Sequence, residues 1–176
     1  MSFADMPLTR LAGTAQERVA ITRDAHVDAL AGYAETDLLC YRAESPVPLI
    51  QRQAREWQPW LDWAALTYDA PLKVTSGIVH VRQDRQALSA LRAAVAAQNI
   101  LVLAGLGILV PLLGSLVLGL AVTEAKLDAL GAHRLAHLDT LFQEEFWGTD
   151  AEALARREAV AADIALAARF IALSRL

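Results

Sequence analysis

The longest uncharged run of the chain, residues 100–122, constrains the fold more than any other feature. It reads ILVLAGLGILVPLLGSLVLGLAV. A bilayer span needs about twenty apolar residues, so the run is long enough to cross a membrane. A helix that is apolar all round can equally be the buried centre of a compact helical domain. The run therefore leaves two classes open: an integral or membrane-associated helical protein that spans at 100–122, and a domain that buries the run in its own core.

Features inside the run and around it favour burial within protein. Pro111 lies in the middle and removes a backbone donor, so we expect two helical segments that meet near this residue. No Trp, Tyr or Lys/Arg cluster flanks the run as in a membrane anchor. Amphipathic helices are predicted on both sides, and their apolar faces need a surface to cover. We therefore predict that residues 100–122 form a buried apolar core segment and not a transmembrane helix.

Helical periodicity recurs along nearly the whole chain. Apolar residues repeat with helical spacing over residues 8–19, 27–34, 46–64, 84–95, 127–146 and 152–171. Residues 72–82 lack this spacing, and their β-branched residues around Gly77 predict at most one short strand pair. The fold class expected is mostly all-α: a single compact domain of six to eight helices over residues 1–176, with a central buried apolar helix pair.

Composition excludes several classes of function. A chain of 176 residues is one domain by the usual size range. Its single cysteine, Cys40, excludes an internal disulfide and a cysteine-rich metal site, and we expect it to be a small buried hydrophobe. The net charge of −4 and the absence of a basic tract argue against a nucleic-acid partner.

Candidate residues for chemistry are few. His133 and His137 lie four apart on a predicted helix, and Asp139 or Glu144 could complete a metal site for an enzyme. The adjacent glutamate of HExxH motifs is missing, so we favour two solvent-facing histidines and expect neither metal nor cofactor. Ser115 lacks the GxSxG spacing of a nucleophile elbow, and we expect a small residue that lets two helices approach closely. The prediction is a protein that is not an enzyme.

Large amphipathic residues gather in two clusters instead. In the first, Tyr41 and Arg42 precede three tryptophans at positions 57, 60 and 63. The second contains Gln143, Glu144, Glu145, Trp147, Asp150 and Glu152. Because Trp, Tyr and Arg dominate protein interfaces, we predict that Tyr41, Arg42 and the second cluster bind a partner protein. The alternative is that the tryptophans, at least two of the four, are core, and that Asp150 and Glu152 only stabilise the N-terminus of the last helix, where Thr149 and Glu152 have capping-box spacing.

These clusters also carry a family resemblance. The chain resembles the assembly chaperones of the F-type ATP synthase alpha subunit, the Atp-twelve family, nearly from end to end and in order. The most specific motifs are TDLLCYRA at residues 36–43 and the pattern QxExWGxD at residues 143–150. The other matching segments are MPLTRLAGTA at 6–15, RQAREWQPWLDW at 52–63, LKVTSGI at 72–78, LLGSLVLGLAV at 112–122 and LDTLFQEEFWGTDAEA at 138–153.

The resemblance implies a function, and the chain departs from the family pattern in two respects. Members bind the free alpha subunit of the catalytic headpiece and prevent its aggregation before beta subunits join, without hydrolysing nucleotide. It implies a protein of the mitochondrial matrix or the alphaproteobacterial cytoplasm, and we expect a monomer. Members carry a β-rich N-terminal domain before MPLTRL, which is absent here, so residues 1–176 correspond to the helical client-binding domain. Where members show Asp-Glu, this chain has Asp139-Thr140, and the role of that glutamate would move to Glu144 or Glu145.

Overall fold

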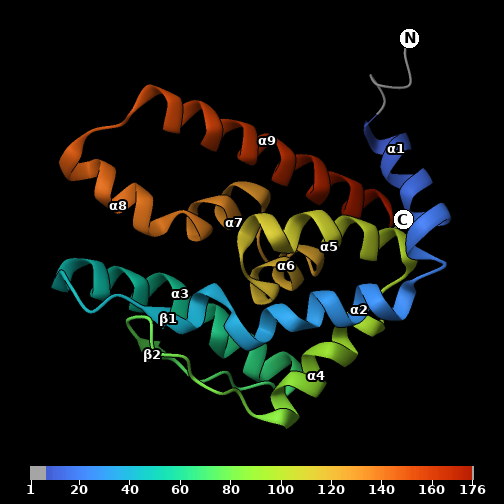
Figure 1. Cartoon of the computed structure of the whole chain (residues 1–176), viewed down its shortest axis with the longest axis horizontal. Helices are drawn as coiled ribbons and strands as arrows, with labels where there is room; N and C mark the ends of the chain where they lie inside the picture. The colour runs from blue at the N-terminus through green and yellow to red at the C-terminus, as the bar shows by residue number, and fades with distance from the viewer. Residues whose placement is uncertain (1–6, 176) are drawn as a thin grey trace.

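Helices make up most of the computed structural model, which describes residues 7–175 (Figure 1). The α-helices are α1 (Pro7–Thr14), α2 (Arg23–Gly32), α3 (Val47–Tyr68), α4 (Arg85–Ala96), α5 (Ile100–Leu113), α6 (Leu116–Thr123), α7 (Ala129–Ala136), α8 (Leu138–Trp147) and α9 (Ala151–Leu173). A π-helical turn (Ala15–Val19) follows α1, and two 3₁₀ turns (Tyr33–Thr36 and Leu38–Cys40) follow α2. The mostly all-α prediction is confirmed. The described part holds nine α-helices because the helix expected over 127–146 breaks at His137, whose φ of −106° and ψ of 18° end α7 before α8 begins.

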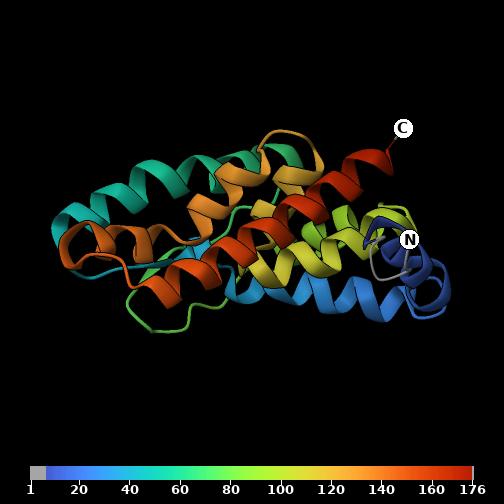
Figure 2. The same cartoon turned by 90° about the horizontal axis from the view of Figure 1, so that it is seen from above.

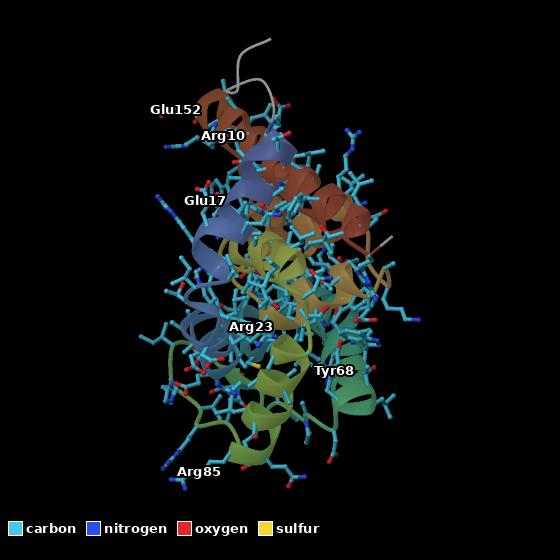
Figure 3. All side chains as sticks on the ribbon, turned by 90° about the vertical axis from the view of Figure 1, so that its right-hand side faces the viewer. Arg10, Glu17, Arg23, Tyr68, Arg85 and Glu152 are labelled. Atoms are coloured by element: carbon cyan, nitrogen blue, oxygen red, sulfur yellow. The ribbon has the colours of Figure 1, made fainter. Side chains whose placement is uncertain are left out.

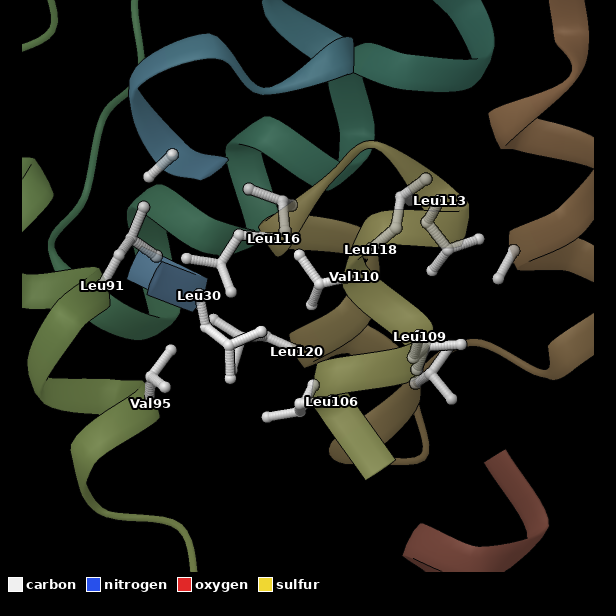
Figure 4. Packing of buried hydrophobic residues seen from close by; sticks show 14 of the residues in the cluster. Leu30, Leu91, Val95, Leu106, Leu109, Val110, Leu113, Leu116, Leu118 and Leu120 are labelled. Carbon is white, nitrogen blue, oxygen red and sulfur yellow. The ribbon is translucent and has the colours of Figure 1, made fainter. Parts of the chain in front are cut away.

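The apolar run forms the centre of the molecule. Figures 1 and 2 show α5 and α6 between α9 on one side and α2, α3 and α4 on the other. All eight residues of α6 are buried. In Figure 4, leucine and valine side chains of α5 and α6 meet Leu30 of α2 and Leu91 and Val95 of α4. The predicted central helix pair is therefore confirmed, and its burial supplies the largest part of the apolar core.

Neither central helix has the length of a membrane span. The 14 residues of α5 extend about 21 Å and the 8 residues of α6 about 12 Å. The hydrocarbon core of a bilayer is about 30 Å thick. Within residues 7–175, no helix combines the length and the apolar character that crossing a membrane requires. The alternative of a span at 100–122 is thus not favoured.

The two segments expected to meet near Pro111 are present, but the break lies three residues further on, at Gly114 and Ser115, so the proline does not make it. Pro111 is an exposed residue within the last turn of α5. Gly114 has a φ of +62°, a conformation that glycine adopts without steric penalty, and it ends α5. Ser115 immediately precedes α6 as its N-cap, and its Oγ accepts a hydrogen bond from the Leu118 amide at 3.1 Å. Ser115 is therefore a buried helix cap, and its expected part in the close approach of two helices stays a prediction.

Close helix approach is seen at Gly105, where α5 crosses α9. A Cβ atom at this position would collide with the side chain of Ile171 on α9. The absence of a side chain lets the two helices make the most extensive helix–helix contact of the described chain. Glycine here is therefore a packing requirement.

The one strand pair within residues 7–175 joins segments that are far apart in the sequence. β1 (Tyr41–Arg42) pairs in parallel with β2 (Thr75–Ser76), with Tyr41 opposite Thr75. One strand lies within 72–82 as expected, but its partner does not, because the bend at Gly77 does not return the chain as a hairpin. The pairing fixes the segment before α4 against the start of α3.

Candidate functional site

Two exposed aromatic side chains mark one end of the molecule. Here the start of α3, the end of α8 and the start of α9 meet, at the left of Figure 1. Trp147 is 88% exposed and Phe146 is 68% exposed. A large aromatic side chain buries about 150–250 Å² when it is covered, so leaving two of them in water is unfavourable. Exposed apolar patches of this kind mark interaction sites.

An apolar groove of about 540 Å³ lies beside these aromatics, between α8 and the start of α3. Its walls are built from Pro46, Pro48, Leu49, Phe142, Phe146 and Trp147, with Ser45 and Gln143 as the polar members. Among residues 7–175, no charged side chain, histidine or cysteine lines the groove. The groove offers apolar contact area and no acid, base or strong nucleophile, so its chemistry suits binding of a protein segment.

Gln53 holds the two walls of the groove together. Its side chain is fully buried on α3. Nε2 donates to Asp139 Oδ1 on α8 at 2.7 Å, and Oε1 accepts from the Ala43 amide at 2.8 Å. The sequence reasoning missed this role. A long polar side chain on the apolar face of a predicted helix could have revealed it, because buried polar groups require partners.

Two ion pairs fix the remaining faces of α8. Arg52 of α3 donates two hydrogen bonds to Glu145, at 2.5 and 2.9 Å, and its guanidinium lies 5.1 Å from the centre of the Phe142 ring. The hydrogen bonds from Arg52 lower the pKa of Glu145. Glu144 pairs with Arg157 of α9, and both of these side chains are mostly covered. Glu144 and Glu145 therefore hold α8 in place.

Gln143 lines the groove beside Trp147, and the other predicted acidic residues lie at the start of α9. Asp150 Oδ2 accepts a hydrogen bond from the Ala153 amide at 2.9 Å and caps the helix. The capping box predicted from Thr149 and Glu152 does not form, because Asp150 occupies the cap position. Glu152 is exposed in the first turn, where a carboxylate is favourable beside the helix N-terminus.

Tyr41 and Arg42 precede α3 and differ in burial. Tyr41 is half-buried, and its hydroxyl lies 3.2 Å from Nδ1 of His80. Arg42 is only 8% exposed, and Nη1 donates to the Gln53 carbonyl at 2.6 Å. Burial lowers the pKa of Arg42, and its guanidinium lies 5.4 Å from the ring centre of Trp57. The structure therefore brings Gln143 and Trp147 of the second cluster to the groove, while Glu144 and Glu145 lie on other faces of α8 and Arg42 is buried against α3.

The tryptophans divide between core and surface. Trp57 is fully buried, and Nε1 donates to the Leu135 carbonyl at 3.0 Å. Trp60 and Trp63 are half-buried, with ring centres 6.4 Å apart in an edge-on arrangement. Trp147 is thus the tryptophan with an open surface for a partner.

His133 and His137 form a stacked pair, with ring centres 4.4 Å apart. His133 is 7% exposed, so the expectation of two solvent-facing histidines is wrong, because α8 and α9 cover this face of α7. Burial, together with the neighbouring His137, lowers the pKa of His133. Asp139 and Glu144 are engaged by Gln53 and Arg157. Between residues 7 and 175, no group of three or more His, Cys, Asp or Glu side chains is arranged to hold a metal ion.

Cys40 is fully buried, as the sequence predicts. Burial raises the pKa of its thiol to about 12, and the nearby Asp37 acts in the same direction. The thiol therefore stays protonated at neutral pH and lacks the thiolate form that nucleophilic chemistry requires.

Comparisons with known proteins agree on one family. Residues 1–65 match the sequence profile of the ATP12 chaperone protein family. The crystal structure of Atp12 from Paracoccus denitrificans is 46% identical, with a TM-score of 0.92 over 96% of this chain and 72% of that chain. A mutant of P. denitrificans Atp12p is 44% identical, with a TM-score of 0.95 over 98% and 74% of the two chains. Protein Atu1473 from Agrobacterium tumefaciens is 35% identical, with a TM-score of 0.89 over 97% and 64%.

Proposed function

The chain belongs to the ATP12 chaperone family, and we propose that it binds the free alpha subunit of the F-type ATP synthase headpiece and prevents its aggregation before beta subunits join. Membership of this family supports a role as an assembly chaperone. In this proposal residues 1–176 are the client-binding unit. It acts as a monomer where the alpha subunit is made or imported, in the alphaproteobacterial cytoplasm or the mitochondrial matrix.

The physical basis of the activity is reversible covering of an apolar surface. An unassembled alpha subunit exposes the area that beta subunits cover in the finished ring, and such patches promote aggregation. A chaperone without an energy source can only bind this area and release it. The affinity of the chaperone for the alpha subunit must exceed the affinity of alpha subunits for one another. It must also remain below the affinity of beta for alpha, so the outcome depends on a difference of affinities.

The exposed aromatic pair at the apolar groove is the observation that carries this proposal. We assign Trp147 as the central contact with the client, and Gln143, Asp150 and Glu152 as its polar surroundings. A partly polar rim suits a complex that must dissociate. In this assignment Arg42 supports the α3 wall, while Glu144 and Glu145 hold α8, so these three act by positioning the groove. Tyr41, whose hydroxyl contacts His80, stays a second candidate contact with the client.

Binding of purified alpha subunit tests the proposal. Truncation of a tryptophan at the centre of an interface to alanine weakens the binding free energy by about 2–4 kcal/mol. We expect Trp147→Ala to weaken the affinity by about 30-fold or more, measured by calorimetry. Leu66→Ala is the matched control, because Leu66 is 89% exposed on the far end of α3.

Folding should be unaffected in both variants, since surface truncations change stability by about 0.5 kcal/mol or less. Thermal unfolding followed by circular dichroism verifies this point. If Trp147→Ala binds the alpha subunit as tightly as Leu66→Ala does, the groove is not the client site.

A further inference from the structure

Exposed apolar side chains are concentrated at the end of the molecule that carries the apolar groove. Residues 7–175 expose eleven large apolar side chains, and six of them lie on three segments: the start of α3, the end of α8 and the loop that contains β2. The six are Val47, Val74, Ile78, Val79, Phe146 and Trp147. In Figures 1 and 2 the loop around β2 lies in the same left-hand part of the molecule as α8. Single apolar residues scattered over a surface are ordinary, whereas a concentration of them marks an interaction surface.

The loop around β2, residues 74–82, is held at its base and along its inner edge. At the base, the buried side chain of Gln83 accepts a hydrogen bond from the Lys73 amide at 2.7 Å and donates one to the Lys73 carbonyl at 2.9 Å. Along the inner edge, β2 pairs with β1, and the Gly77 amide donates to the Arg42 carbonyl at 2.8 Å. The backbone of the loop is therefore fixed before any partner binds.

The tip of this loop is apolar and open to solvent. Ile78 is 99% exposed, and Val79 beside it is 68% exposed. The next residue, His80, is anchored, because its Nδ1 lies 3.2 Å from the hydroxyl of Tyr41. Contacts on both sides hold the tip in place, so covering it with a partner costs less ordering entropy than covering a mobile loop. Ile78 and Val79 are therefore a preformed apolar contact.

Glu44 connects the tip to the apolar groove. A Cβ atom at Gly77 would lie 2.9 Å from Cδ of Glu44, so the Glu44 side chain lies directly against the turn before Ile78. One residue separates Glu44 from Pro46 in the groove wall, and this places their Cα atoms within about 8 Å of each other. A specific interface covers about 800 Å² on each partner. An interface of this size that is centred on the groove extends onto the loop.

We infer that the client-binding surface extends from the apolar groove across Glu44 to the tip of the β2 loop, where Ile78 and Val79 make a second apolar contact with the alpha subunit. The inference rests on the proposed function, because one client molecule covers both contacts. The two contacts have the same chemistry, so both match the apolar area that beta subunits cover in the finished ring. Tyr41 lies at the foot of the second contact, since its hydroxyl anchors His80.

Loss of the Ile78 side chain tests the inference. We expect Ile78→Ser to weaken the affinity for purified alpha subunit by about tenfold, since a covered isoleucine contributes in proportion to the apolar area removed from water. Leu66→Ser is the matched control, because it removes a similar apolar side chain that is 89% exposed. Leu66 lies two residues before Tyr68, which is labelled in Figure 3, a view from the side opposite the groove. The affinity of this control should stay within about twofold of the wild type.

A dye at the tip tests its coverage directly. Cys40 is the one cysteine of the chain and is fully buried, so Ile78→Cys introduces a thiol that a polarity-sensitive maleimide dye labels selectively. The emission should shift to shorter wavelength when alpha subunit is added, because the client excludes water from the tip. The same dye on Leu66→Cys should not shift. With Trp147→Ala added to the chain labelled at position 78, the alpha concentration that gives half of the shift should rise by about 30-fold, because the same client covers the groove.

The outcomes separate this inference from the proposed function. If either the loss of affinity in Ile78→Ser or the shift at position 78 is missing, the extended surface is refuted, while binding by the wild type and its loss in Trp147→Ala still support the chaperone. A shift that appears on concentrating the labelled chain alone would assign the tip to a second copy of this chain and would also refute the inference. If the wild-type chain does not bind the alpha subunit at all, the proposed function fails first. Circular dichroism of Ile78→Ser confirms that a loss of binding does not come from unfolding.

Discussion

Asp37 is expected to make the folded protein less stable as the pH rises from about 4 to about 6. Its carboxyl is fully buried beside the start of α6. Oδ2 accepts a hydrogen bond from the Val117 amide and Oδ1 one from the Leu39 amide, both at 3.1 Å. Burial raises the pKa of Asp37 from 3.8 to about 6, although these hydrogen bonds act in the opposite direction.

The sign and size of the effect follow from this shift. The folded state holds the proton more tightly than the unfolded state, so the contribution of Asp37 to the free energy of unfolding is greatest below the unfolded pKa. It is lost as the pH rises through the folded pKa. A shift of about two units corresponds to about 3 kcal/mol. Above about pH 6 the contribution of this group is constant.

Asp37→Asn removes the titrating group while keeping its size. The free energy of unfolding should be measured by urea denaturation for both proteins at pH 4 and pH 7. Because other carboxyl groups titrate equally in both, the wild-type value minus the variant value should fall by about 2.4 kcal/mol between these pH values, since part of the contribution is already lost at pH 4. A difference that does not change with pH would refute the argument that burial dominates at Asp37.

Two further changes test the packing of the fold. Gly105→Ala should lower the free energy of unfolding by about 1–3 kcal/mol, because the new Cβ meets Ile171 in a close-packed contact. Gly107→Ala is its control on the same helix. No atom lies within 4 Å of the new Cβ there, and alanine should raise stability by about 0.5–1 kcal/mol. Equal effects of the two changes in urea denaturation would contradict the close approach of α5 and α9. Gln53→Leu should cost about 2–4 kcal/mol, since it leaves Asp139 and a backbone amide without their partner. A variant as stable as the wild type would remove Gln53 as the link between α3 and α8.

The central helix pair was predictable because a long uncharged run among amphipathic helices can be kept from water in few other ways. The position of its break was not. Pro111 is the obvious helix breaker, yet α5 continues through it, and the break is set at Gly114 and Ser115. Tertiary contacts fix that position: the Leu38 amide donates to the Gly114 carbonyl at 3.0 Å, and Asp37 accepts from the first turn of α6. Because Leu38 and Asp37 are distant in the sequence, the residues around the break do not by themselves predict these contacts.

The functional surface was predictable only in part. Trp147 and Gln143 stand out by residue type and spacing, and both lie at the groove. Arg42 stands out by the same criterion but is buried, because its environment depends on how β1 meets α3. The opposite wall of the groove, with Pro46 and Pro48, comes from a distant part of the sequence. Only the folded chain brings the two walls together.

Aggregation of purified alpha subunit, followed by light scattering, tests the central claim most directly. An equimolar amount of this chain should suppress the rise in scattering, and addition of beta subunits should then release alpha into alpha–beta complexes. Scattering that rises as fast as with an inert protein at the same concentration would contradict the account.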